Sequence, residues 1–350
     1  MDWKQAAALC GMDRALCTLA ELYCRQDAPE EEIAAWFAGI RFEALRPEAS
    51  GMAAAMAASR NYAGVPAALI PRLRGIIKYV HTLNAGMTAG LYSLGGLLRD
   101  AGIPMVLLGG TAVHFGCPQA PVRHLWRMQL GVSEGDFRRV EELAAKAGFT
   151  VETTPWCVTA RKGNTQCVAI VRGAEGAGAL TTGGISFRMP SQAELLTGMA
   201  DTLFQLFLDK SPGAKLLPWI MDLRCVLSWI SDWEQTAALC AKQGQAARVR
   251  FMLQWYAGIS GQELPQSLLD LFGTDRETRR LERLLGSCRR CGDKGHRWKR
   301  LWLSARIRCP ENSLSAAKIF VFALKRAIKR RISRLCGSQD QQPGASARTR

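Results

Sequence analysis

Long apolar runs are absent from this 350-residue chain. No stretch of 18 or more consecutive apolar residues occurs, so no transmembrane helix is expected. The first residues also lack a basic segment followed by an apolar one, and we therefore expect no secretory signal. Because 48% of the residues are hydrophobic, the chain can still bury a sizeable core, divided between two or three domains.

The cysteine pattern of a small disulfide-stapled protein is missing as well. The 12 cysteines are scattered through a long chain rather than grouped in a short one. Cys10, Cys17 and Cys24 recur every seven residues, as buried small residues on one helix face do. We therefore expect reduced thiols and a cytoplasmic protein, which could also attach to the inner face of a membrane.

Acidic residues are scarce in the last quarter of the chain. Residues 275–350 contain 21 Lys and Arg but only 6 Asp and Glu, a net charge of +15, whereas residues 1–274 have a net charge of +1. Such asymmetry is typical of a protein with an anionic partner, such as nucleic acid or a phospholipid surface.

The spacing of apolar residues predicts most of the secondary structure. Recurrence at three and four residues predicts helices at 3–25, 29–40, 50–60, 66–81, 82–101, 134–147, 191–209, 216–230, 232–243, 245–259 and 265–272. Short apolar runs between glycine-rich turns predict strands at 104–108, 126–132, 149–153, 156–161, 165–172 and 184–189. The pattern favours a small α/β unit between helical segments.

One segment carries most of the functional information. An apolar strand at 104–108 leads into Gly109-Gly110-Thr111, and a lone Arg123 precedes a second strand at 126–132. A glycine turn that opens a helix exposes backbone N–H groups to which a phosphate can bind, and arginine is a good phosphate ligand. Gly109, Gly110, Thr111 and Arg123 are therefore candidates for binding a nucleotide or a phosphorylated ligand. A simple strand–helix turn, with Arg123 paired to an acid elsewhere, is the alternative.

Residues 40–270 resemble the bacterial uncharacterised nucleotidyltransferase family, a branch of the polymerase-β-like superfamily. The likeness rests on the order and spacing of Asn84, Gly109-Gly110-Thr111, Arg123, Leu130-Gly131-Val132, Ala147-Gly148-Phe149, Asp222-Leu223 and Asp232-Trp233. The resemblance implies an α+β fold, with a small nucleotidyltransferase-like mixed sheet and flanking helices embedded between N- and C-terminal helical segments. We expect an N-terminal helical region (1–81), the α/β core (82–190), a C-terminal helical region (191–285), a basic helical extension (286–337) and a disordered tail (338–350).

The acids that such an enzyme needs are missing. Phosphoryl transfer in this superfamily uses metal ions held by an Asp-x-Asp pair on the second strand, since alternate residues of a strand face one metal site. Arg127 and Gln129 occupy those two positions, and the strand at 165–170 supplies no third carboxylate. Glu134 and Asp136 follow the strand, at the expected start of a helix. We therefore expect them to interact with the helix dipole rather than to replace the missing metal ligands. We therefore expect no confident catalytic residue, and Mg²⁺ with a nucleoside triphosphate only if activity is retained.

The basic C-terminal quarter contains two further patterns. Cys288, Cys291 and His296 match three ligands of a zinc knuckle, but Leu301 stands where the fourth should be, so zinc is a weak prediction and incidental cysteines are the alternative. Residues 315–336 combine an apolar face with seven Lys and Arg. This composition fits an amphipathic helix on an anionic membrane surface, a nucleic-acid contact, or a helix packed on the body.

Three functions remain open from the sequence. The first is a catalytically degenerate nucleotidyltransferase, a pseudoenzyme that retains the scaffold and the phosphate-binding turn. The second is an active nucleotidyl transferase with acids from other positions. The third is a binding or scaffold protein that acts through its basic C-terminus.

Overall fold

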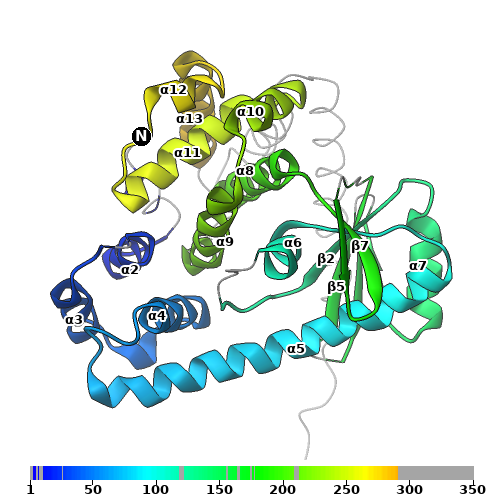
Figure 1. Ribbon diagram of the computed structural model, residues 1–350, viewed down its shortest axis with the longest axis horizontal. Coiled ribbons are helices and arrows are strands. Elements are labelled where there is room, and N and C mark those ends of the chain that lie inside the picture. Colours follow the sequence, from blue (N-terminus) through cyan, green and yellow to red (C-terminus); the bar gives the residue numbers. More distant parts are fainter. Residues whose placement is uncertain are drawn as a thin grey trace, which may run out of the picture. The chain divides into compact units, whose positions relative to one another are not determined.

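The computed structural model describes residues 3, 4, 7, 11–25, 27–117, 122–154, 157–163, 166–173, 176, 178–208 and 213–290. It confirms the expected fold class, a mixed α+β protein in which helices flank a mixed sheet (Figure 1). Residues 1–278 group into one compact unit and residues 279–350 into a second. The finer domain boundaries expected from the sequence stay predictions. No helix among the described residues is long and apolar enough to cross a membrane.

Seven strands form the sheet in the order β3-β4-β5-β2-β1-β7-β6. They are β1 (Val106–Leu107), β2 (Met128–Val132), β3 (Thr150–Thr153), β4 (Cys157–Lys162), β5 (Gln166–Arg172), β6 (Gly178–Thr182) and β7 (Ile185–Met189). β2 pairs parallel with β5 and antiparallel with β1, and β1 pairs parallel with β7. The two strands of the candidate site, β1 and β2, therefore lie at the centre of the sheet.

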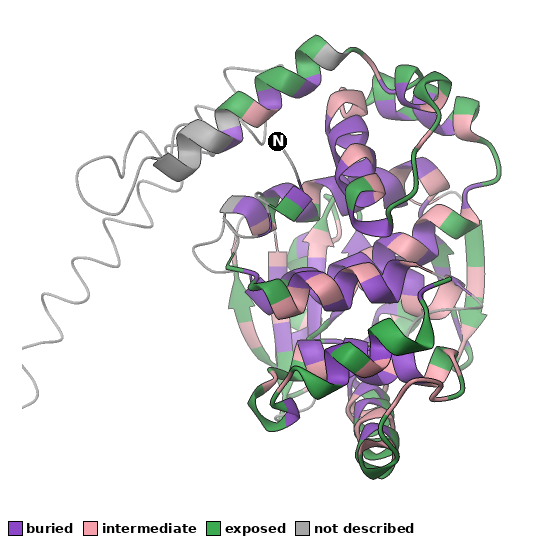
Figure 2. Ribbon diagram, turned by 90° about the vertical axis from the view of Figure 1, so that its left-hand side faces the viewer, coloured by how far each residue is buried: buried purple, intermediate pink, exposed green. Residues whose placement is uncertain are grey.

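The N-terminal helices are α2 (Arg14–Cys24), α3 (Glu30–Ala38), α4 (Pro47–Ser59) and α5 (Ile70–Asp100). The single helix expected over 3–25 is interrupted, because Gly11 takes a positive φ of 79° and Asp13 starts α2 by accepting a hydrogen bond from the Leu16 N–H. Buried residues run through the middle of the helical part, and exposed residues cover its outer surfaces (Figure 2).

Helix α5 is one continuous helix of 31 residues, where the sequence suggested two. Its second half packs on the sheet, since a Cβ at Gly90 would lie 2.8 Å from Cβ of Gln166 on β5. Asn84, buried on α5, donates to the Arg123 carbonyl at 2.8 Å and accepts from the Leu125 N–H at 3.0 Å. The long helix therefore fixes the segment that leads into β2.

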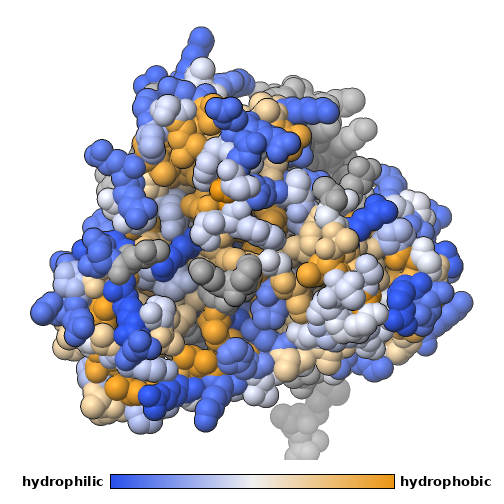
Figure 3. Space-filling model, in the orientation of Figure 1, coloured by the Kyte–Doolittle hydropathy of each residue, from blue (hydrophilic) through white to orange (hydrophobic). Residues whose placement is uncertain are grey.

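The remaining helices are α6 (Gly109–Gly116), α7 (Phe137–Lys146), α8 (Gln192–Leu208), α9 (Leu216–Trp229), α10 (Trp233–Lys242), α11 (Ala246–Ser260), α12 (Gln266–Asp270) and α13 (Asp275–Arg290). Of these, α7 to α12 agree with the sequence pattern to within a few residues, whereas α6 and α13 were not among the predicted ranges. Helices α8 and α9 pack together, and α9 also contacts α6, which follows the glycine turn. On the face shown in Figure 3, apolar residues reach the surface in separate patches bordered by polar ones.

Candidate functional site

The glycine turn lies where β1 ends and α6 begins. Gly109 has a positive φ of 50°, and a Cβ there would overlap with Oε1 of Gln129. Gln129 is tied to the same turn by its backbone, because its N–H donates to Thr111 Oγ1 at 2.7 Å and its carbonyl accepts from the Leu108 N–H at 3.0 Å. The turn therefore needs glycine for two reasons, its backbone conformation and the close approach of the Gln129 side chain.

Arg123 is bound to an acid rather than left open for a ligand. Its guanidinium forms a two-point ion pair with Asp222 on α9, in which Nε donates to Oδ1 and Nη2 donates to Oδ2, the latter at 2.6 Å. Nη2 also donates to the Gly110 carbonyl at 3.1 Å. Arg123 and Asp222 are each 7% exposed. The alternative in which Arg123 pairs with an acid elsewhere is the arrangement that the structure contains.

Asp222 is a carboxylate in an unfavourable environment. Burial raises its pKa from 3.8 to about 6, although the adjacent Arg123 charge and hydrogen bonds act in the opposite direction. Desolvation penalises an ionised carboxylate unless a cation compensates for it. Asp222 and Arg123 therefore depend on each other. If either side chain were removed, the other would be left as a buried, unpaired charge, at a large cost in stability.

The two positions of the expected Asp-x-Asp pair lie at the start of β2. Arg127 is exposed just before the strand, and Gln129 is half-buried within it. On β5, Ala169 pairs with Gln129, and Cys167 lies close enough to Arg127 and Arg161 that their charges oppose the rise in its pKa caused by burial. The described residues at the start of β2 and on β5 thus place a cation, an amide and a thiol on this part of the sheet.

A magnesium ion does not fit these residues. Among the described residues, no three His, Cys, Asp or Glu side chains come together in a group that could hold a metal ion. The carboxylate nearest the turn, Asp222, is already paired with Arg123. Since Mg²⁺ is held by carboxylate oxygens, the described side chains around the turn do not form a set that fits it.

The acids after β2 interact with partners outside this turn. Glu134 pairs with Arg172 of β5. Asp136 stands immediately before α7 and accepts a hydrogen bond from the Ser133 hydroxyl at 2.7 Å. The N-cap of α7 is Asp136, and the helix begins at Phe137, three residues later than the predicted start at 134. Both acids occupy the helix-start region that the sequence indicated.

The two histidines near the turn have lowered pKa values. Burial lowers the pKa of His114, and the positive charge of Arg123 lowers it further. Burial also lowers the pKa of His124, whose ring lies 4.4 Å from that of Trp126 between centroids.

The structure contains a disulfide that the sequence did not indicate. Cys117, just after α6, is bonded to Cys225 on α9, 108 residues later. The expectation of reduced thiols is therefore wrong for this pair, because the fold brings α6 and α9 together although nothing in the local sequence marks the two cysteines as partners. Cys24, Cys157, Cys167 and Cys240 are free thiols.

The C-terminal predictions fall mostly beyond the described residues. Cys288 lies in the last turns of α13, whereas Cys291, His296 and residues 315–336 lie outside the described part of the chain. The zinc knuckle and the amphipathic helix stay predictions.

Comparison with known proteins gives little further. No family model matches the chain, and no curated protein matches it. A solved structure does match, the antibiotic-resistance factor ANT(2'')-Ia determined in solution, with 13% identity and a TM-score of 0.33 over 47% of this chain and 96% of that one. A likeness at this level carries no information on what this chain binds or catalyses.

Proposed function

We propose that this chain is a nucleotidyltransferase-like protein that has lost metal-dependent transfer and acts by binding. The observation that carries the proposal is the state of the charged groups around the glycine turn. Arg127 and Gln129 stand at the expected acid positions, and Asp222, the nearby carboxylate, is neutralised by Arg123. Two-metal catalysis requires carboxylates to hold the ions and orient the phosphates, so this arrangement favours a scaffold or ligand-binding role.

The resemblance of residues 40–270 to the uncharacterised nucleotidyltransferase family supports the scaffold part of the proposal. The turn at Gly109–Thr111 still opens a helix, and helix starts are common phosphate sites, so the proposed partner is a nucleotide or phosphorylated ligand. The Thr111 N–H already donates to the Leu108 carbonyl and Gln129 lies against Gly109, so such a ligand would have to displace the Gln129 side chain. Any such ligand would bind without help from a divalent cation. An active transferase that draws acids from other positions is the competing interpretation.

Calorimetric titration of the full chain with ATP, GTP, CTP and UTP, with and without Mg²⁺, distinguishes the proposed binding protein from an active transferase. The proposal predicts that each affinity is the same with the cation and with EDTA. Asp222→Asn serves as a matched variant, since it neutralises the acid nearest the turn. Mg²⁺-dependent binding that Asp222→Asn abolishes, or transfer of a labelled nucleotide to any acceptor, would contradict the proposal.

A second role is favoured by the +15 charge of residues 275–350. We propose that this segment attaches the protein to an anionic membrane surface, because residues 315–336 combine apolar and basic residues as interfacial helices do. Flotation with vesicles of anionic or neutral lipid should show binding to the anionic ones, lost when residues 310–350 are deleted. Equal binding by the truncated chain, or binding of RNA in preference to the vesicles, would contradict this role. Zinc measured in the purified protein tests the knuckle at Cys288 separately.

A further inference from the structure

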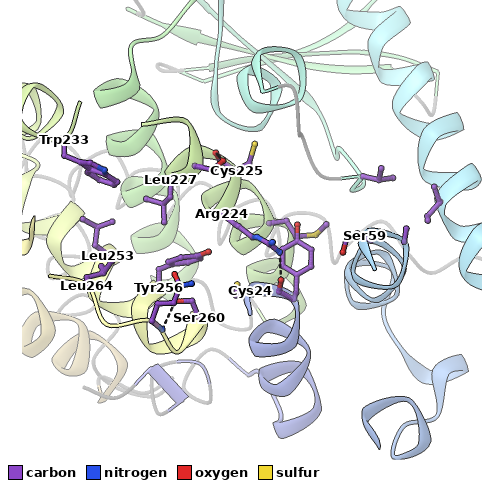
Figure 4. A pocket seen from close by; sticks show the side chains of 18 residues that line it. Cys24, Ser59, Arg224, Cys225, Leu227, Trp233, Leu253, Tyr256, Ser260 and Leu264 are labelled. Carbon is purple, nitrogen blue, oxygen red and sulfur yellow. Dashed lines mark hydrogen bonds between the residues drawn. The ribbon is translucent and has the colours of Figure 1, made fainter. Parts of the chain in front are cut away.

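A cavity of about 610 Å³ lies among the helices. Residues of α2, α4, α9 and α11 contribute to its wall, and Figure 4 shows Arg224 near its centre, between Cys24, Tyr256 and Ser59. Cavities of about 300 to 1,000 Å³ are typical of small-molecule sites. This cavity is therefore large enough for a ligand with an aromatic ring or a short aliphatic chain.

Helix α9 contributes to both the turn and the cavity. Asp222 contacts Arg123, whereas Arg224 contributes to the cavity wall. Residues two positions apart in an α-helix project about 160° apart, which places these two side chains on nearly opposite faces. Val122 and Cys225 also line the cavity, so it borders the region of the turn, but Arg224 is not part of the ion pair there.

The charge of the cavity wall is uncompensated. Arg224 is its one permanently charged side chain, and none of the described residues lining the cavity is Asp or Glu. Within the described chain Arg224 makes no ion pair with a carboxylate, while its charge also helps to lower the pKa of the nearby Arg60. Burial raises the pKa of Tyr23 and of Cys24 to about 12, so neither supplies a negative charge at neutral pH.

Arg224 is also held in position. Nη1 donates to the Tyr23 carbonyl, and the guanidinium carbon lies 5.0 Å from the centroid of the Tyr23 ring. A guanidinium has five donors, so this contact leaves several for a ligand. An arginine fixed before binding loses little conformational freedom when a ligand arrives.

The other polar groups of the wall offer few donors. The Ser59 hydroxyl donates to the Met56 carbonyl and the Ser228 hydroxyl to the Cys225 carbonyl, both at 2.8 Å. Among the described lining residues the guanidinium is the one permanently charged donor, and an acceptor with negative charge suits it best. Leu227, Leu253 and Trp233 supply apolar wall nearby.

We propose that this cavity binds a small anionic molecule whose carboxylate or phosphate is held by Arg224 and whose apolar body contacts the leucines and Trp233. Both head groups accept paired hydrogen bonds from a guanidinium, so they share the recognition chemistry. The proposal stands apart from any nucleotide binding at the glycine turn.

The test is calorimetric titration of the full chain with benzoate, phenyl phosphate, inorganic phosphate and the neutral analogue benzamide. We expect benzoate or phenyl phosphate to bind at least about tenfold more tightly than benzamide and inorganic phosphate, since charge and apolar body both contribute. The better of the two anions identifies the head group. If neither binds below about 10 mM, or if benzamide binds equally well, the proposal is wrong.

Two variants of the cavity wall locate the binding. Arg224→Gln should weaken binding of the anions at least about tenfold. Arg224→Lys should recover part of this loss, because an ammonium keeps the positive charge but cannot donate the paired hydrogen bonds of a guanidinium. Ala58→Trp leaves every charge in place and should block the probes by filling the cavity. Arg139→Gln, an exposed arginine of α7, is the matched control for a lost positive charge. Circular dichroism confirms that each variant is folded, and unchanged binding by folded Arg224→Gln and Ala58→Trp would overturn the assignment.

Discussion

Two arginines on either side of helix α9 have opposite surroundings. Arg123, beside the glycine turn, is buried against Asp222 and the Gly110 carbonyl. Arg224, in the wall of the helical cavity, contacts a backbone carbonyl and an aromatic ring but no described carboxylate. Arg123 is buried, and a buried charge needs a counter-charge, which Asp222 supplies. Arg224 is half-buried and has no described carboxylate beside it, so its charge is available to an anionic ligand.

The comparison teaches that the recognisable site and the available site need not coincide. The turn carries the sequence signature, yet Arg123 and Asp222 there satisfy each other. The cavity has no signature in the sequence, because its lining residues come from helices far apart in the chain. An uncompensated charge is therefore a second place to look for binding, beside the surviving motif.

The largest effect is expected on breaking the buried pair. Asp222→Ala should lower the free energy of unfolding by about 3 to 5 kcal/mol, because Arg123 is left buried without its counter-charge. Urea denaturation followed by circular dichroism measures this. Replacing both partners with apolar residues, Arg123→Met with Asp222→Leu, should recover much of the loss.

The control for this prediction is an exposed ion pair of the same chain. Arg72 pairs with Glu43 on the surface, and Arg72→Ala should change stability very little, because water screens both charges. Equal losses in Asp222→Ala and Arg72→Ala would show that the Arg123–Asp222 pair is not buried in solution.

A smaller effect is expected on cutting the covalent link between the two regions. The Cys117–Cys225 disulfide joins the end of α6 to the cavity wall on α9. Cys117→Ser should lower the free energy of unfolding by about 2 to 4 kcal/mol, since the bond closes a long loop in the unfolded chain. Dithiothreitol should lower the melting temperature of the original protein and leave that of Cys117→Ser unchanged. Recovery of both thiols in the free form from unreduced, denatured protein would rule the bond out.

Sequence periodicity predicted the helical parts of the fold well, and the reason is local. In α8 through α11 the apolar residues recur at helical spacing, so each helix was located to within one or two residues. Strand β6 was missed because GALTT is short, mostly exposed and carries little apolar alternation. The sequence prediction divided helix α5 into two helices, because the elements that its apolar residues contact change along the helix, from α4 to β5.

The candidate site was less predictable, because it depends on pairings between distant residues. The missing acids at Arg127 and Gln129 could be seen in the sequence, because finding them requires only a comparison of single positions with the family pattern. The partner of Arg123 could not, because Asp222 lies 99 residues away on another helix. The disulfide and the cavity escaped for the same reason, as both arise only where α9 packs against elements from elsewhere in the chain.

The smallest predicted effect tests how tightly the turn is closed. Gly109→Ala should lower stability by about 1 to 2 kcal/mol, because an L-residue is strained at a φ of 50° and its Cβ would displace the Gln129 side chain. Gly102→Ala is the matched control, since Gly102 has a φ of 69° with open space around the added Cβ. The loss of stability in Gly109→Ala beyond that in Gly102→Ala measures the overlap with the Gln129 side chain. Adding Gln129→Ala to Gly109→Ala should remove this extra loss and leave only the loss caused by the strained backbone. If the two glycine variants lose equal stability, Gln129 does not cover the turn, and the turn is more open to a ligand than the paired state of Arg123 and Asp222 suggests.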